Sequence, residues 1–479
     1  MADRFDPAVD EVAEALQLVS RAAIEYVEGL PQKSVRMTGA DAAAEGFAGP
    51  LPEEGSGALE TLRQVLAQGM DGAISSAGPR FFHFVIGGST PAALGADWLT
   101  STLDQNNGAW VAAPLAAQLE MVSLGWLKDL FGLPDSWGGV LTTGATMANF
   151  TALACARRWW GQQHDRDVDS DGLSGLPSLP VFSGGYIHPS ATKALAMLGI
   201  GRSVTRAFSR DAVGRIDLGG LEDALRSLDG APAIVIANAG EVNAGDFDPI
   251  ASMADLAERY GAWLHVDGAF GLFASLSSHS EHLTQGTDRA HSVIADGHKW
   301  LNVPYDCGFA FVRDPALLPP VFSLIASYLP DFEDPRPNFF NFGPESSRRA
   351  RSLAVWATLH AYGRNGYRRL VEKHLDLAQR IASRVDAAAD LERLADVQLN
   401  IVCFRFRPPG SSEEELNQLN RRLGERVLQD GRVYVGTTVY DGRVAFRPAI
   451  VNWQTTEEDV DLLVEVIREI GAEIAGGPS

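Results

Sequence analysis

Two stretches decide the fold of this chain: Trp-Leu-His-Val-Asp-Gly-Ala-Phe at 263–270 and Ser-Val-Ile-Ala-Asp-Gly-His-Lys-Trp-Leu at 292–301. Each begins with a short apolar run typical of a buried strand and ends in a polar or glycine cluster. Asp267 ends the first run, and Lys299 follows the second. Removal of a lysine ammonium from water favours the neutral amine, which is a nucleophile. The sequence therefore predicts an amine and a carboxylate at the ends of two strands.

The surrounding sequence alternates between strand-like and helix-like segments. This alternation predicts a largely parallel sheet with right-handed crossovers, and ligands gather at the carboxyl ends of such strands. The predicted strands are 138–143, 233–238, 263–267, 292–295 and 308–313, and the predicted helices are 147–160, 221–228 and 250–260.

A lysine that forms a Schiff base and an aspartate that pairs with a pyridinium nitrogen are the two protein groups that pyridoxal phosphate (PLP) most needs. Singly, a Lys-Trp pair is typical of an amphipathic surface, and His-Val-Asp is typical of a strand end. Together, in this order, the two stretches resemble the group II PLP-dependent amino-acid decarboxylases, the family of the aromatic-amino-acid and glutamate decarboxylases. The resemblance runs from about Phe47 to the C-terminus and is strongest between Gly138 and Trp356.

The resemblance implies an α/β fold, the PLP-dependent transferase fold type I, with a mostly parallel central sheet flanked by helices. It also implies a helical N-terminal arm (1–100), a large PLP-binding domain (101–363) and a small α+β C-terminal domain (364–479). In relatives the arm wraps the partner subunit, so we expect a homodimer with shared active sites.

The predicted cofactor-binding residues follow strand ends. Gly144-Ala145-Thr146 joins a strand to a helix, and small residues at a helix N-terminus suit a phosphate, although such turns are common in α/β proteins. The resemblance makes this the phosphate turn. It also places His188 flat on the PLP ring, where the alternative is a capping or core histidine. Ala269 leaves room for the ring, and the resemblance places Asp296 and His298 near the phosphate.

Candidate substrate residues lie in three segments. The aromatic segment 79–84 is either a buried edge strand or, by resemblance, a pocket segment that places Phe82 and His83 near the substrate side chain. In relatives, the segment with Asn106 and Trp110 contributes residues to the active site of the neighbouring subunit. Arg349, at a basic helix start, supports the site in relatives.

Two further residues concern the reaction. Tyr328 begins a long loop, 328–346, whose other aromatic residues are phenylalanines. In relatives a loop tyrosine assists protonation of Cα, so Tyr328 is a candidate catalytic residue. Arg447 is either a ligand for the substrate carboxylate, as in related aminotransferases, or one charged strand residue among several.

Bulk properties exclude several classes of protein. The 479 residues are 46% hydrophobic, which is ample for a core, and the net charge of −21 argues against nucleic acid as a partner. Three widely spaced cysteines indicate neither a disulfide framework nor a metal pair. With no apolar run of membrane-spanning length and no basic-then-apolar start, we expect a cytoplasmic protein that is neither exported nor embedded in a membrane.

The predicted reaction is the α-decarboxylation of an L-amino acid to an amine and CO2, with PLP bound to Lys299 as a Schiff base. Lys299 and Asp267 would equally serve an aldehyde synthase, a transaminase or a carbon–carbon lyase. A non-catalytic relative that serves as a binding protein is the alternative from another class.

Overall fold

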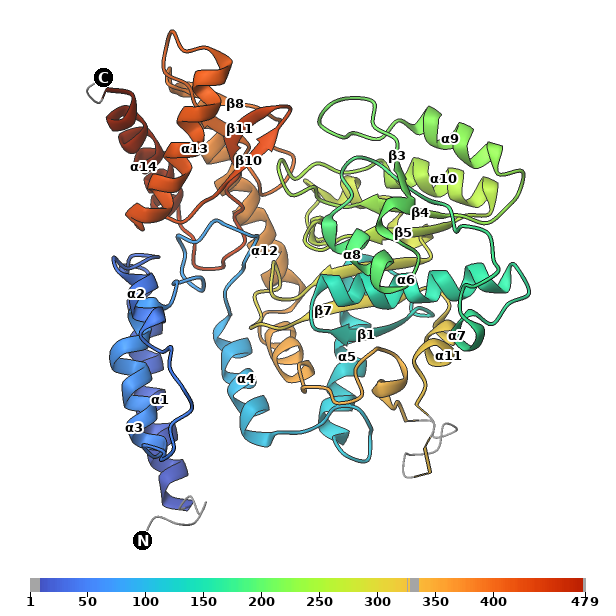
Figure 1. Cartoon of the computed structure of the whole chain (residues 1–479), viewed down its shortest axis with the longest axis horizontal. Coiled ribbons are helices and arrows are strands. Elements are labelled where there is room, and N and C mark those ends of the chain that lie inside the picture. The colour runs from blue at the N-terminus through green and yellow to red at the C-terminus, as the bar shows by residue number, and fades with distance from the viewer. Residues whose placement is uncertain (1–8, 325, 328–335, 477–479) are drawn as a thin grey trace.

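A computed structural model of the chain describes residues 9–324, 326–327 and 336–476 (Figure 1). Its centre is a seven-stranded sheet in the order β1-β7-β6-β5-β4-β2-β3. The pairs from β3 through β2, β4 and β5 to β6 are parallel, whereas β7 is antiparallel to both of its neighbours, β6 and β1. The prediction of a mostly parallel sheet is therefore confirmed. The strands are β1 Gly138–Thr142, β2 Val181–Ser183, β3 Thr205–Ala207, β4 Ile234–Asn238, β5 Trp263–Asp267, β6 Ser292–Asp296 and β7 Gly308–Val312.

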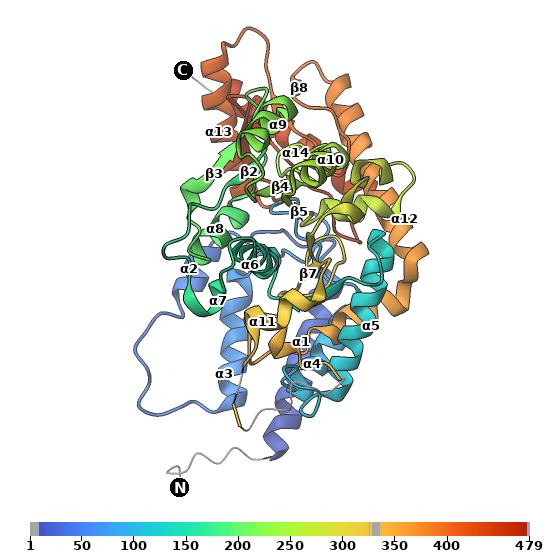
Figure 2. The same ribbon diagram turned by 90° about the vertical axis from the view of Figure 1, so that its right-hand side faces the viewer.

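Helices cover both faces of this sheet, which explains its apolar strands. Every residue of β4, β5, β6 and β7 is buried. Successive side chains of a strand point to opposite faces, so Val235 and Ala237 pack in one core with α10, while Ile234 and Ile236 pack in another with α6 and α8. Figure 2 gives a second view of these layers, turned by 90°.

The helices follow the predicted pattern closely, and the predicted 250–260 matches α10 at both ends. In Figure 1, α1 to α3 form an arm that stands apart from the sheet. The helices are α1 Val9–Gly29, α2 Ala40–Glu45, α3 Ala58–Gln64, α4 Pro91–Leu103, α5 Pro114–Phe131, α6 Ala145–Gln162, α7 Val168–Asp171, α8 Pro189–Met197, α9 Leu218–Ser227, α10 Ile250–Tyr260, α11 Leu318–Phe322, α12 Ser352–Ala387, α13 Glu413–Asp430 and α14 Glu457–Gly476.

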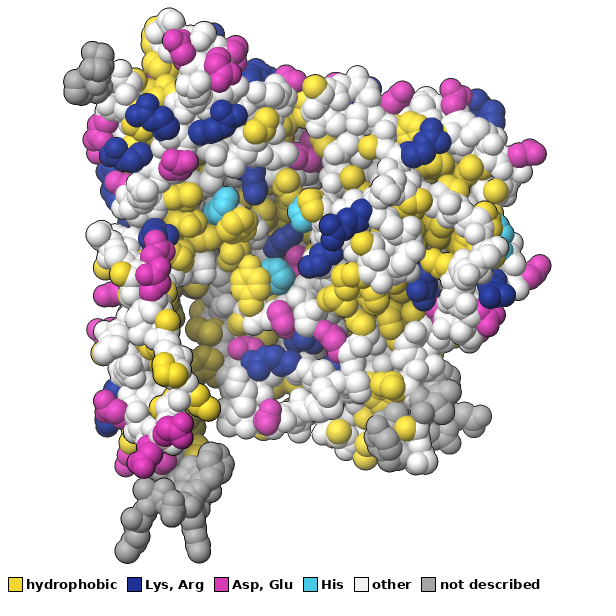
Figure 3. Space-filling view, viewed as in Figure 1, with side chains coloured by type: hydrophobic (Ala, Val, Ile, Leu, Met, Phe, Trp, Pro, Cys, Tyr) yellow, Lys and Arg dark blue, Asp and Glu magenta, His cyan; other side chains and the backbone are white. Residues whose placement is uncertain are grey.

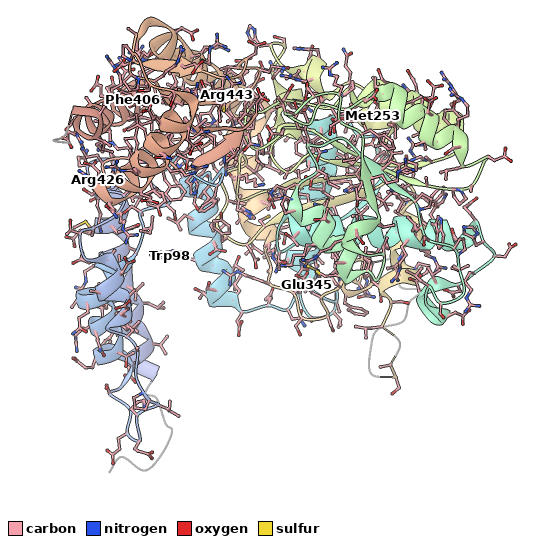
Figure 4. All side chains as sticks on the ribbon, turned by 45° about the horizontal axis from the view of Figure 1, so that its top comes forward. Trp98, Met253, Glu345, Phe406, Arg426 and Arg443 are labelled. Atoms are coloured by element: carbon pink, nitrogen blue, oxygen red, sulfur yellow. The ribbon has the colours of Figure 1, made fainter. Side chains whose placement is uncertain are left out.

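The C-terminal part is built on a four-stranded antiparallel sheet in the order β10-β11-β9-β8. Helix α12 leads into it and is interrupted by non-helical backbone at Gly363. The interruption coincides with the predicted bound between the large and small domains, which we retain as a proposal. Figure 4 marks Phe406 and Arg443 in this part of the chain. The strands are β8 Leu391–Arg393, β9 Phe404–Phe406, β10 Thr437–Tyr440 and β11 Arg443–Phe446.

Within the described ranges, no helix is long and apolar enough to cross a lipid bilayer. All three cysteines are buried and unpaired.

A buried ion pair ties the helices to the edge of the large sheet. Glu120 of α5 and Arg348 are 1% and 2% exposed, and Arg348 Nη2 lies 2.7 Å from Glu120 Oε1. Both groups also bond to the backbone of Leu141 in β1, at 2.9 Å and 2.8 Å. Removing one partner of a fully buried pair leaves an uncompensated charge, which is far more costly than losing an exposed pair.

We therefore expect Arg348→Ala to lower the free energy of unfolding by about 3–5 kcal/mol. The matched control is Arg349→Ala, because Arg349 pairs with Asp97 at the surface, where the expected loss is below about 1 kcal/mol. Guanidinium unfolding curves measure both losses. Similar losses for the two variants would contradict this account of the buried pair.

Candidate active site

One cavity lies where β4, β5 and β6 end and α6 begins. Its volume is about 280 Å³. All the predicted cofactor-binding residues line it, because parallel strands that end at one edge deliver their following loops to one place. In the view of Figure 3, histidine and basic side chains gather near the middle of the molecular face. The lining residues predicted from sequence are Gly144, Ala145, Thr146, His188, Asp267, Ala269, Asp296, His298 and Lys299.

Lys299 lies in the turn that follows β6. Its Nζ is 3.3 Å from Asp296 Oδ2 and 5.8 Å from the centre of the Phe270 ring. The side chain is 16% exposed, so the amine faces the cavity rather than bulk solvent. Lys299 thus presents a primary amine between a carboxylate and an aromatic ring.

A segment from the N-terminal part of the chain, residues 79–90, packs on this turn. Gly87 N donates to His298 O at 3.2 Å, and a Cβ at Gly87 would lie 1.8 Å from Lys299 O. Glycine is therefore required here for the backbones to approach each other. The same segment bonds to Tyr434 and Ala449 through the backbone of Phe82. It thereby joins the lysine turn to the C-terminal part.

Asp267 ends β5 and is 5% exposed. Its Oδ1 accepts from Ala269 N at 3.2 Å, and its Oδ2 accepts from Asn149 Nδ2 at 2.9 Å. Two N–H donors thus hold a carboxylate at the wall of the cavity.

His188 is the residue before α8 and caps that helix. Its Nδ1 accepts from Ser190 N at 3.2 Å. Burial lowers the pKa of the His188 imidazole, while the nearby Asp267 carboxylate opposes that shift. The ring therefore lies in the cavity wall mainly as a neutral imidazole near pH 7.

Asp296 fixes the N-terminus of α6. Its Oδ1 accepts from Ala145 N at 2.6 Å, and its Oδ2 lies 3.5 Å from His298 Nε2. Gly144 has φ +127°, and a Cβ there would meet the His298 ring at 3.1 Å. Burial lowers the pKa of His298. The N-terminus of α6 thus already binds one carboxylate oxygen, that of Asp296. The role of residues 144–146 as a phosphate-binding turn stays a prediction.

The loop after β4 also lines the cavity, although its sequence pattern did not predict this. Glu241 is 5% exposed, its Oε2 accepts from Ala244 N at 2.9 Å, and burial raises its pKa. Arg447 Nη1 donates to Val242 O at 3.1 Å. The loop could have been predicted to line the cavity, because it follows the predicted parallel strand 233–238 at the same edge of the sheet. The missed lining residues are Thr143, Met147, Tyr186, Ser190, Asn238, Gly240, Glu241, Val242 and Phe270.

Two predicted substrate residues lie elsewhere. Phe82 is 1% exposed in the core of the C-terminal part, because Phe81 forms a bridge with Tyr434 and turns its neighbour inward. Phe82 does not line the cavity of its own chain, and its predicted role near the substrate stays a prediction. Arg349 pairs with Asp97 of α4 at 2.8 Å and not with the cavity, because Arg348 takes the buried position.

The other predicted substrate residues also lie outside the cavity of their own chain. His83 Nδ1 accepts from Gly436 N at 3.1 Å, and burial lowers the pKa of His83 to about 4. Asn106 Oδ1 accepts from Arg348 N at 2.8 Å, and Trp110 N donates to Asn338 Oδ1 at 3.2 Å. Their roles stay predictions, and Tyr328 lies outside the described residues.

Comparison with known proteins decides the family. A family model described as the pyridoxal-dependent decarboxylase conserved domain matches residues 51–407. The chain is also 30% identical over 460 residues to the aromatic-L-amino-acid decarboxylase of Bacillus atrophaeus, with 94% of each protein covered. This chain belongs to the pyridoxal-dependent decarboxylase family.

Further relatives and solved structures belong with the same kind of enzyme. The L-2,4-diaminobutyrate decarboxylase of Rhizobium meliloti is 29% identical over 481 residues, covering 99% of this chain and 91% of the relative. The crystal structure of Oryza sativa TDC with PLP and tryptamine matches with a TM-score of 0.89 at 26% identity, covering 98% of this chain and 100% of that one. This pyridoxal-dependent decarboxylase is thus a PLP-dependent carboxy-lyase of fold type I, as the sequence predicts.

The residues of the cavity fit PLP. The cofactor needs an amine, an acid for its ring nitrogen and donors for its phosphate. Lys299, Asp267 and the N-terminus of α6 supply groups of these three kinds in one cavity. Gly144 and Ala269 leave space in the cavity, since neither carries a side chain larger than a methyl group.

We expect Asp267→Asn to retain PLP and lose most activity, because a neutral amide no longer favours a protonated ring nitrogen. The loss of a charge-assisted hydrogen bond corresponds to about 2–3 kcal/mol, or roughly 30- to 150-fold in kcat. The matched control is Asp459→Asn, since Asp459 is also 5% exposed but lies outside the cavity. Turnover of Asp267→Asn near the wild-type rate would contradict the assignment.

Proposed function

We propose that this enzyme removes the α-carboxylate of an L-amino acid as CO2 and releases the amine, with Lys299 as the amine that binds PLP covalently. The observation that carries the proposal is that Lys299, Asp267 and the N-terminus of α6 share one cavity. When bound, PLP supplies the electron sink for the pair left on Cα. The side chains of the cavity would bind the cofactor and transfer the protons.

Asp267 holds a proton at the ring nitrogen, supported by the N–H groups of Asn149 and Ala269. Lys299 would hold the cofactor through its amine, and the same amine would accept or return a proton once the cofactor is bound to the substrate. His188 lines the cavity and would cover one face of the cofactor ring, with its cavity-facing nitrogen donating the proton that Cα receives. These roles need groups at fixed positions: Asp267 ends β5, His188 caps α8, and Lys299 lies in the turn after β6.

Arg447 is the proposed ligand of a substrate carboxylate. Among the described residues, no carboxylate forms an ion pair with it, and its Nη1 is held by Val242 O in the cavity loop. Burial lowers the pKa of Arg447, with Glu241 acting in the opposite direction. A half-buried guanidinium that no described carboxylate contacts as an ion pair is suited to an incoming anion.

A panel of the L-amino acids tests the proposal. We expect CO2 release with an equal amount of amine from at least one of them, and no turnover by Lys299→Ala, which lacks the amine that binds PLP.

Borohydride reduction followed by peptide mapping is expected to find the cofactor on Lys299. Labelling of another lysine would overturn the assignment. Wild-type product that is mainly aldehyde, with stoichiometric oxygen uptake, would favour the aldehyde-synthase alternative.

The active unit is proposed to be a homodimer in the cytoplasm, with each site completed by residues of the partner. Apolar side chains on α1 and α4 support a second copy as the partner, since Val12, Leu16 and Leu99 are each 57% exposed. Hydrophobic side chains are visible along the arm in Figure 3, and Figure 4 marks Trp98 on α4. Val12 and Leu16 lie one turn apart on α1, and grouped exposed apolar side chains are typical of a protein interface.

Mixing two inactive variants tests the shared sites. In a hybrid of Lys299→Ala and Trp110→Ala, one of the two sites combines the intact Lys299 of one chain with the intact Trp110 of the other. We expect the mixed, refolded sample to regain roughly a quarter of wild-type activity, as random pairing gives half hybrids with one good site each. A fully active monomer in light scattering, or no regained activity in verified hybrids, would refute shared sites.

A further inference from the structure

We propose that Asn149 is a positioning residue that orients Asp267 and His188 together, and that a buried hydrogen-bonded chain from Trp263 to His188 fixes the proton of the His188 ring on Nε2. The catalytic consequence rests on the proposed function, but the proton positions do not.

Asn149 is the branch point of this chain. It lies on α6, is fully buried, and does not line the cavity. Its Nδ2 donates to Asp267 Oδ2 at 2.9 Å and to Ser190 Oγ at 3.3 Å. Its Oδ1 lies 2.8 Å from His265 Nε2. One amide thus contacts Asp267 directly and His188 through Ser190.

The direction of the hydrogen bonds behind Asn149 follows from donor chemistry. The Asp267 carboxylate accepts, so the amide NH2 of Asn149 faces it and Oδ1 accepts from His265 Nε2–H. His265 Nδ1, 2.8 Å from Ser292 Oγ, is then an acceptor of the hydroxyl proton. Ser292 Oγ in turn accepts from the Trp263 indole N–H at 2.9 Å. Burial lowers the pKa of His265 to about 4, which is consistent with a single ring proton.

The branch toward His188 is equally directed. Ser190 N donates to His188 Nδ1 at 3.2 Å, and a backbone N–H can only donate, so Nδ1 carries no proton. Ser190 Oγ accepts from Asn149 and lies 2.7 Å from the same Nδ1, to which it donates its own proton. The neutral His188 ring therefore carries its proton on Nε2.

This Nε2 is the nitrogen that remains for the substrate. His188 lines the cavity, and its Nε2 has no hydrogen-bond partner in the described part of the chain. A proton held there can be donated to a substrate oxygen or to Cα, whereas the other tautomer would present a lone pair. The buried chain thus sets what His188 offers to the reaction.

Neutron diffraction from deuterium-exchanged crystals of the holoenzyme at pH 7.5 tests the proton positions in the wild type, whatever the activity. We expect deuterium on Nε2 of both His188 and His265 and none on either Nδ1. Deuterium on Nδ1 of either ring would overturn the proposal. An enzyme that releases no CO2 from any amino acid would refute the proposed function but leave this result standing.

Kinetics test the positioning role. We expect Asn149→Ala to retain PLP and to lower kcat by about 10- to 100-fold with KM changed less than threefold, because both side chains lose their shared anchor. The matched control is Asn420→Ala, which removes another fully buried, hydrogen-bonded asparagine in the C-terminal part. A kcat for PLP-loaded Asn149→Ala within twofold of the wild type, or an equal fall in the control, would overturn the role.

Discussion

The carboxylate of Asp296 is the group on which the geometry of the site depends. One of its oxygens receives the first N–H of α6 at 2.6 Å, and the other lies 3.3 Å from the Lys299 amine. A helix N-terminus and an ammonium are both positive, so a single buried anion stabilises both and keeps them close. Since Asp296 ends β6, the position of that strand sets the position of the amine. The central sheet therefore helps to position the Lys299 amine through the Asp296 side chain.

Most of the fold and the cofactor site could be predicted because their signals are local. The strand end at Asp267 is readable from a short stretch, while β6 ends one residue later and α6 begins two residues earlier than predicted. The parallel topology brings these ends to one edge. The position of the predicted substrate residue Phe82 instead depends on non-local pairing. The bridge between Phe81 and Tyr434 turns Phe82 into a core more than 300 residues away in sequence, and no pattern near Phe82 reveals it.

Neighbouring arginines illustrate a second limit of sequence reasoning. Arg348 and Arg349 are chemically identical, yet one is buried against Glu120 and the other pairs with Asp97 at the surface. A helix or strand period cannot choose between adjacent residues in an irregular segment. The choice is made by the buried Glu120, which must find a cation. A buried acid in a largely apolar helix such as α5 is the signal that would have favoured Arg348.

The segment 79–90 has a consequence for how the chain is made. Its backbone partners include His298, Asn302, Tyr434 and Ala449, all synthesised long after it. During synthesis this segment must remain without these contacts until nearly the whole chain has left the ribosome, although the sheet can already form. The lysine turn would therefore receive its final packing as one of the last events of folding, and newly made chains would carry an exposed aromatic run until then.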